Sequence, residues 1–198
     1  MSTLLIKVGG AAAAASGVLV VVQEVWSLAV GGLTEGRAES AVHTTQVLLL
    51  VPGVVGLYLA QQHAMRRFGQ VATLVALLGS TVMSGAALTE VTLLPELTAA
   101  GSPLADDHGT VTGVIWLVAV ATWIGGLLLF GTATWRAGVL PRPAAALVVT
   151  GLLLGLALQG FVPGILTVYA GGLVWLGISA ARRPAPAPTV SPASALVS

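Results

Sequence analysis

Long apolar stretches recur along the whole chain, and they constrain its fold more than any other feature. A helix needs about 20 apolar residues to cross the hydrocarbon core of a bilayer. Only 8% of the 198 residues are charged, whereas a soluble domain carries about a quarter. Because so few charges cannot cover a water-exposed surface, we expect a membrane protein. Six spans are predicted: Leu4–Val30, Ala41–Ala60, Val71–Leu94, Val111–Thr132, Ala144–Phe161 and Ile165–Ala181.

The last two predicted spans form one nearly continuous apolar stretch, from Ala144 to Ala181. At about 1.5 Å per residue this stretch is too long for a single crossing. The segment GFVPG, from Gly160 to Gly164, supplies a break, because proline removes a backbone donor and glycine permits a tight turn. We therefore predict an all-α, polytopic membrane protein, a bundle of six transmembrane helices, with five spans as the alternative.

Basic residues alternate between the loops and predict the orientation of the chain. Cytoplasmic loops of membrane proteins are enriched in lysine and arginine. Every second loop is basic here, whereas the opposite loops carry acidic residues or no charge, so both termini are expected in the cytoplasm. The basic residues are Lys7 near the start of the first span, Arg66 and Arg67 after the second, Arg136 and Arg142 after the fourth, and Arg182 and Arg183 after the sixth.

The two ends of the chain differ in character. The first apolar stretch resembles a signal peptide, because it combines Lys7 with an Ala- and Val-rich sequence. However, Gln23 and Glu24 interrupt the apolar sequence, and the stretch is long enough to span the membrane. We expect it to be a retained helix. After Arg183 the sequence turns rich in Pro, Ala and Ser, which is typical of a disordered tail. Residues 1–183 are therefore predicted as the membrane domain and 184–198 as a cytoplasmic tail.

Four polar side chains interrupt the first three spans: Glu24, His43, Gln46 and Glu90. Residues three or four apart share one face of a helix, and each of these side chains shares a face with small residues. Small residues mark the contacts between helices in lipid, so we expect the polar side chains to point into the bundle. From the outer ends of their spans, Glu24, Glu90 and His43 lie about 9, 6 and 3 Å deep. A polar cluster near the outer surface is therefore predicted, opening toward the outside.

Three interpretations of this cluster are open. Carboxylates near a helix end can reach interfacial water or hydrogen-bond a neighbouring helix, which is a structural role. They can instead bind a ligand or a proton. A metal site of Glu24, His43 and Glu90 is the third interpretation, but no local ligand spacing such as H-x-x-x-H supports it. We predict no metal ion and no cofactor.

Aromatic and amide side chains are candidates for the wall of the same pocket. Trp116 and Trp123 are seven residues apart and share a face of the fourth span, while Gln159 and Tyr169 flank the predicted outer hairpin. Such a stripe is more often packing than a ligand wall. Small-residue faces, including a GxxxG pair at residues 151 and 155, favour close helix packing within the chain or between copies in a homo-oligomer.

Several function classes lack their usual sequence signals. Cysteine is absent, which excludes disulfides and thiol chemistry. No nucleophile elbow, phosphate-binding loop, dinucleotide fingerprint or zinc-protease motif is present. The basic residues are scattered, so no nucleic-acid partner is expected. The expected partners are the lipid bilayer and a small-molecule or lipid ligand.

Several segments together carry a resemblance to a known group. They are TEVTLLPEL around Glu90, the segment LLLFGTATWRAGVLPRPAAALVVTGLLLG, the segment LLVPGVVGLYL, and GGLVWLGISA near the end. From Val42 to Arg183 the chain resembles uncharacterised six-span integral membrane proteins of actinobacteria and related bacteria. The resemblance implies a bacterial plasma-membrane protein and a six-helix bundle, and it brings no activity. The family pattern often has aromatic residues two positions before and after the glutamate, where this chain has Leu88 and Thr92.

The leading functional hypothesis is a non-enzymatic membrane protein with an outward-facing polar pocket. That pocket would bind a small molecule, a lipid or a proton during transport or sensing. The first alternative is a structural or accessory membrane subunit without a ligand of its own. The second is an intramembrane enzyme acting on a lipid or isoprenoid, with a protonated glutamate as general acid and two tryptophans against a carbocation.

Overall fold

A computed structural model describes residues 2–30, 37–102, 110–158 and 161–183 of the chain. These residues form six α-helices and no strand. The predicted tail, residues 184–198, lies outside the described residues. The helices are α1 (Ser2–Val30), α2 (Arg37–Leu59), α3 (Arg67–Ala99), α4 (Thr110–Ala137), α5 (Arg142–Leu158) and α6 (Thr167–Ala181).

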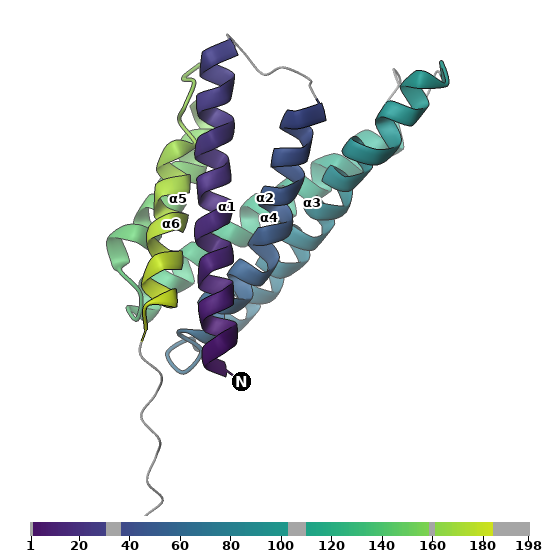
Figure 1. Cartoon of the computed structure of the whole chain (residues 1–198). Helices are drawn as coiled ribbons and strands as arrows, with labels where there is room; N and C mark the ends of the chain where they lie inside the picture. Colours follow the sequence, from purple (N-terminus) through teal and green to yellow (C-terminus); the bar gives the residue numbers. More distant parts are fainter. Residues whose placement is uncertain (1, 31–36, 103–109, 159–160, 184–198) are drawn as a thin grey trace, which may run out of the picture.

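Consecutive helices are neighbours, and α6 packs back against α1, so the six helices form a closed ring. The chain runs up and down the bundle, which places the start of α1 and the end of α6 at the same lower end in Figure 1. At the opposite, upper end, α3 and α4 lean away from α1 (Figure 1). The ring is therefore closely packed at its lower end and more open at its upper end.

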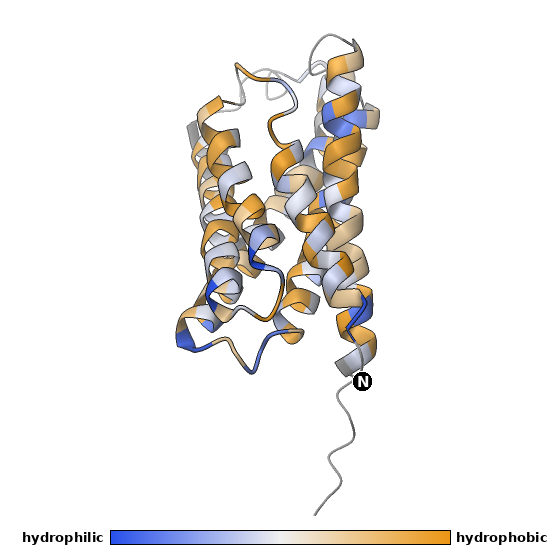
Figure 2. Cartoon of the chain, turned by 90° about the vertical axis from the view of Figure 1, so that its left-hand side faces the viewer, coloured by the Kyte–Doolittle hydropathy of each residue, from blue (hydrophilic) through white to orange (hydrophobic). Residues whose placement is uncertain are grey.

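Four of the helices are long and apolar enough to cross a membrane: α1 to α4. α5 and α6 are also apolar but have only 17 and 15 residues. Large apolar side chains lie exposed on the outside of the bundle, including Leu4 at 67% exposure and Leu117 at 65%. Figure 2 shows this hydrophobic character along the helices. Because water would penalise such a surface, the chain is a helical membrane bundle.

Small residues allow the helix backbones to approach closely, as the sequence predicted. A Cβ atom added at Gly9 in α1 would lie only 2.5 Å from Gly56 Cα in α2. The GxxxG pair packs within the chain, because Gly151 lies against Tyr169 and Gly155 against Leu166. These contacts join α5 to the segment that begins α6.

The helices and the predicted spans differ at several ends. α3 does not end at Leu94 but continues through Pro95 to Ala99, because the bundle tolerates a single missing donor and the next left-handed residue is Gly101, with φ of 62°. α5 ends at Leu158 rather than Phe161. Phe161 is 85% exposed, and an apolar side chain of this kind can face lipid from a turn as readily as from a helix. The predicted break between the last two helices is confirmed, with Gly164 at φ of 83°.

Candidate functional site

A pocket of about 370 Å³ lies in the more open half of the ring, and all six helices contribute to it. It is lined where α1, α3 and α5 approach their C-terminal ends and where α2, α4 and α6 begin. This alternation follows from the up-and-down topology, which gathers six helix ends at one surface. The arginine-bearing connections lie at the other end of the bundle (Figure 1).

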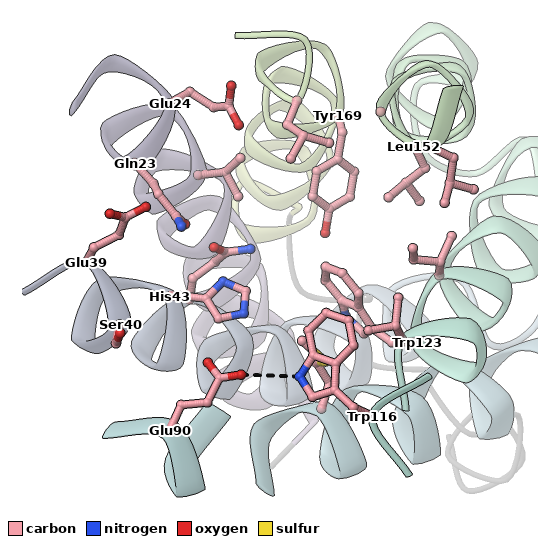
Figure 3. Close-up of a pocket in the computed structure, with 18 residues that line it drawn as sticks. Gln23, Glu24, Glu39, Ser40, His43, Glu90, Trp116, Trp123, Leu152 and Tyr169 are labelled. Atoms are coloured by element: carbon pink, nitrogen blue, oxygen red, sulfur yellow. Dashed lines mark hydrogen bonds between the residues drawn. The ribbon is translucent and has the colours of Figure 1, made fainter. Parts of the chain in front are cut away.

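One side of the pocket is polar and is supplied by α1, α2 and α3 (Figure 3). We call this the polar wall. Its position is fixed by hydrogen bonds between the three helices, because Ser16 Oγ donates to the Gln46 carbonyl at 2.9 Å and Thr44 Oγ1 lies 3.1 Å from the Ala87 carbonyl. The wall consists of Gln23, Glu24, Glu39, Ser40, His43, Gln46 and Glu90.

The His43 imidazole lies within the polar wall, between two helices that carry carboxylates. It interacts electrostatically with Glu90 of α3 and with Glu39 of its own helix, and the Gln46 side chain lies one turn away on the same face. The carboxylate of Glu24 contacts the backbone amide of Gly164 in the connection before α6. The polar wall therefore carries three carboxylates and one imidazole.

The facing side of the pocket is aromatic and is supplied by α4 and α6. We call Trp116, Trp123 and Tyr169 the aromatic wall. Tyr169 is only 1% exposed, and its hydroxyl points into the space between the walls, toward Trp123 (Figure 3). Gly151 fixes this side chain in place, since α5 packs directly on the backbone of Tyr169.

One hydrogen bond links the two walls, from Trp116 Nε1 to Glu90 Oε1 at 3.2 Å (Figure 3). Two other donors of the aromatic wall have no partner. The Tyr169 hydroxyl and the Trp123 indole N–H are both buried and make no hydrogen bond with the described residues. A buried donor without a partner costs about 1–3 kcal/mol. Two side chains of the aromatic wall therefore carry a buried donor without a partner, and the Tyr169 hydroxyl is the one that points between the walls.

The structure brings together seven of the eight residues that the sequence singled out. Gln159 lies outside the described residues. The others line this one pocket: Glu24, His43, Gln46, Glu90, Trp116, Trp123 and Tyr169. His43 and Glu90 lie about 9 and 14 Å from the ends of their helices, because α2 begins at Arg37 and α3 continues to Ala99.

Sequence reasoning missed several residues of the pocket. Glu39 lies four residues before His43 and so shares its helix face, a spacing that could have identified it. Leu152 and Leu156 of α5 also line the pocket. They carry no signal, because an apolar residue in an apolar helix looks the same whether it faces lipid, a neighbour or a cavity.

Among the residues that the structure describes, no group of side chains could bind a metal ion. No three side chains of His, Asp or Glu lie close enough there to hold one ion. Glu24, His43 and Glu90 stand around the pocket as separate groups.

Comparison with family models, with curated proteins and with solved structures finds no match to this chain. Its function is therefore inferred from the geometry of the pocket.

Proposed function

We propose that this chain is a six-span protein of the bacterial plasma membrane that binds a small molecule in an outward-facing pocket. Crossing by the two short helices is supported by their position. α5 and α6 are about 26 and 23 Å long, against a hydrocarbon core of about 30 Å. As a pair they pack in the ring between α4 and α1, which are both long enough to span. Membership of the six-span group that the sequence resembles is part of the proposal.

The proposed orientation places the lower end of Figure 1 in the cytoplasm. Arg66 and Arg67 precede α3, Arg136 and Arg142 flank the connection to α5, and Arg183 follows α6. All of these lie at the end of the bundle opposite the pocket (Figure 1). The positive-inside rule then puts the termini in the cytoplasm and the pocket toward the outside.

A binding role is supported above all by one observation, the unpaired Tyr169 hydroxyl that points into a pocket lined by all six helices. In a purely structural subunit, buried polar groups are expected to hydrogen-bond neighbouring helices. Glu90 and Trp116 do so, whereas Tyr169 and Trp123 do not. Transport and sensing both begin with this binding step.

The absence of native cysteine makes single-cysteine labelling a direct test of this orientation. Ser40→Cys places a thiol on the polar wall, and His63→Cys places one in the exposed connection between α2 and α3. In intact cells, a membrane-impermeant maleimide is expected to label Ser40→Cys at least about 10-fold faster than His63→Cys. The difference should disappear after permeabilisation, because the lower end then becomes accessible.

The opposite pattern, with His63→Cys labelled in intact cells, would overturn the orientation. Absence of labelling at Ser40→Cys in both intact and permeabilised cells would overturn the accessible pocket. The variant Gln70→Cys near the start of α3 serves as a second reporter of the lower end, because its side chain is also exposed.

A further inference from the structure

The ionisable side chains around the pocket are mostly acidic. Three carboxylates line it, those of Glu24, Glu39 and Glu90, and none of the described side chains that line it is Lys or Arg. His43 is the other titratable group of the polar wall, and its single charge cannot balance the carboxylates of Glu24 and Glu90 together. Two like charges at 4 Å repel by about 4 kcal/mol at the effective dielectric constant near a protein surface. An anionic ligand is therefore disfavoured here and a cation is favoured.

The aromatic wall suits the same kind of ligand. The faces of tryptophan and tyrosine attract cations, and they attract an apolar body equally well. Trp123 and Tyr169 face the carboxylates across the pocket (Figure 3). A ligand with a small cationic head and an apolar body can therefore touch both walls at once. A compact, strongly hydrated metal ion could not use the aromatic wall in this way.

The two unpaired donors add a further requirement. The Tyr169 hydroxyl and the Trp123 indole N–H need an acceptor oxygen or nitrogen, and no described side chain supplies one. A hydrocarbon cation would leave both donors unsatisfied. A ligand that carries an ester, ether, amide or hydroxyl oxygen on its apolar body would pair at least one of them. The volume of about 370 Å³ is in the range of small-molecule pockets.

We infer that the ligand is an organic monocation, an amine or quaternary ammonium group on an apolar body that also bears a hydrogen-bond acceptor. The cationic head lies at the Glu90 end of the polar wall, and the acceptor lies at Tyr169 and Trp123. This inference rests on the proposed function, which requires only that the pocket is reached from outside and binds a small molecule.

Three matched probes separate these requirements. Butyrylcholine carries the cation and the ester oxygen, heptyltrimethylammonium lacks the ester, and 3,3-dimethylbutyl butyrate lacks the charge. Binding to the purified full chain in detergent can be followed by tryptophan fluorescence, because two tryptophans line the pocket. We expect butyrylcholine to bind about 10-fold more tightly than the neutral ester and several-fold more tightly than the alkyl cation.

Single substitutions test which side chains contact the cationic head and which contact the ester oxygen. Glu90→Gln is expected to weaken butyrylcholine binding about 10-fold, whereas Glu96→Gln, an exposed glutamate of the same helix outside the pocket, is expected to leave it unchanged. Tyr169→Phe should weaken butyrylcholine several-fold and leave heptyltrimethylammonium unaffected. Tyr58→Phe is the matched control, because this tyrosine does not line the pocket. If Glu90→Gln fails to fold, Glu24→Gln tests the negative charge of the polar wall from α1.

Two results would overturn the inference. In the first, the neutral ester or heptanoate binds more tightly than butyrylcholine, and Tyr169→Phe weakens its binding as much as it weakens butyrylcholine binding. In the second, no probe shows binding that is weakened by Glu90→Gln, Glu24→Gln or Tyr169→Phe. Either result leaves the proposed function standing if the thiol of Ser40→Cys is reached from outside. An inaccessible thiol removes the proposed function as well.

Discussion

Gly172→Ala is expected to destabilise the bundle by about 1–3 kcal/mol, whereas Gly171→Ala, one position earlier, is expected to be neutral or slightly stabilising. The two glycines are adjacent in α6 but lie about 100° apart around the helix, and only Gly172 faces α5. A Cβ at Gly172 would lie 2.7 Å from Val148 N and 2.8 Å from the Ala144 carbonyl oxygen in α5. No atom lies within 4 Å of a Cβ at Gly171.

The loss of stability expected for Gly172→Ala follows from the kind of atoms that the added Cβ would meet. Backbone atoms of α5 cannot rotate aside as the end of a flexible side chain can, so the two helices must move apart. At Gly171 the added methyl meets only the surroundings of the bundle, and alanine favours a helix over glycine by about 0.5–1 kcal/mol. The measurement is thermal unfolding of both variants in the same detergent, followed by circular dichroism.

The adjacent glycines of α4 repeat the comparison at another helix contact. A Cβ at Gly126 would lie 2.7 Å from Ala76 Cα, and one at Gly125 has no neighbour within 4 Å. Gly126→Ala should therefore be the destabilised member of that pair. Equal stabilities within both pairs would contradict the packing of α5 on α6 and of α3 on α4 described above.

Arg183→Ala is expected to cost about 1.5–3 kcal/mol of stability, the range for hydrogen bonds from charged groups. Arg183 Nη1 donates to the Ala60 carbonyl at 2.7 Å, and Nη2 donates to the Val139 carbonyl. These carbonyls follow α2 and α4, so one guanidinium joins the ends of three helices. Cations are also favourable at helix C-termini.

Arg182→Ala is the matched control, because Arg182 is exposed and carries the same charge. It is expected to change stability by less than about 0.5 kcal/mol. Arg183→Lys should restore part of the loss at most, because an ammonium group lacks the planar fork that reaches two carbonyls. Unfolding of the three variants in one detergent checks this order. Equal losses at both arginines would point to net charge instead of these contacts.

The architecture was largely readable from hydropathy, because a bilayer requires each crossing to be a long apolar helix. The break before α6 was readable as well, since Gly164 adopts a left-handed conformation that glycine permits. The closed ring was not predictable. Packing of α6 against α1 depends on small residues such as Gly10 and Gly177 meeting each other, and the sequence does not state which small-residue faces pair.

The polar wall was predicted better than the rest of the pocket. A carboxylate or imidazole in an apolar helix stands out, and its small-residue neighbours show which way it points. The helix ends near His43 and Glu90 were not predicted, because hydropathy marks where apolar sequence stops, and α2 and α3 extend beyond that point. The unpaired hydroxyl of Tyr169 could not be foreseen, since hydrogen bonding depends on what lies opposite in the fold.

A crystal structure of the full chain grown in a lipidic phase with butyrylcholine would show directly whether the pocket binds an organic cation. We expect ligand density between the polar and aromatic walls, with the ammonium group at Glu90 and the ester oxygen within hydrogen-bond distance of Tyr169. Glu24 and Glu90 facing lipid, or lying on opposite sides of a bundle with no cavity between them, would contradict it.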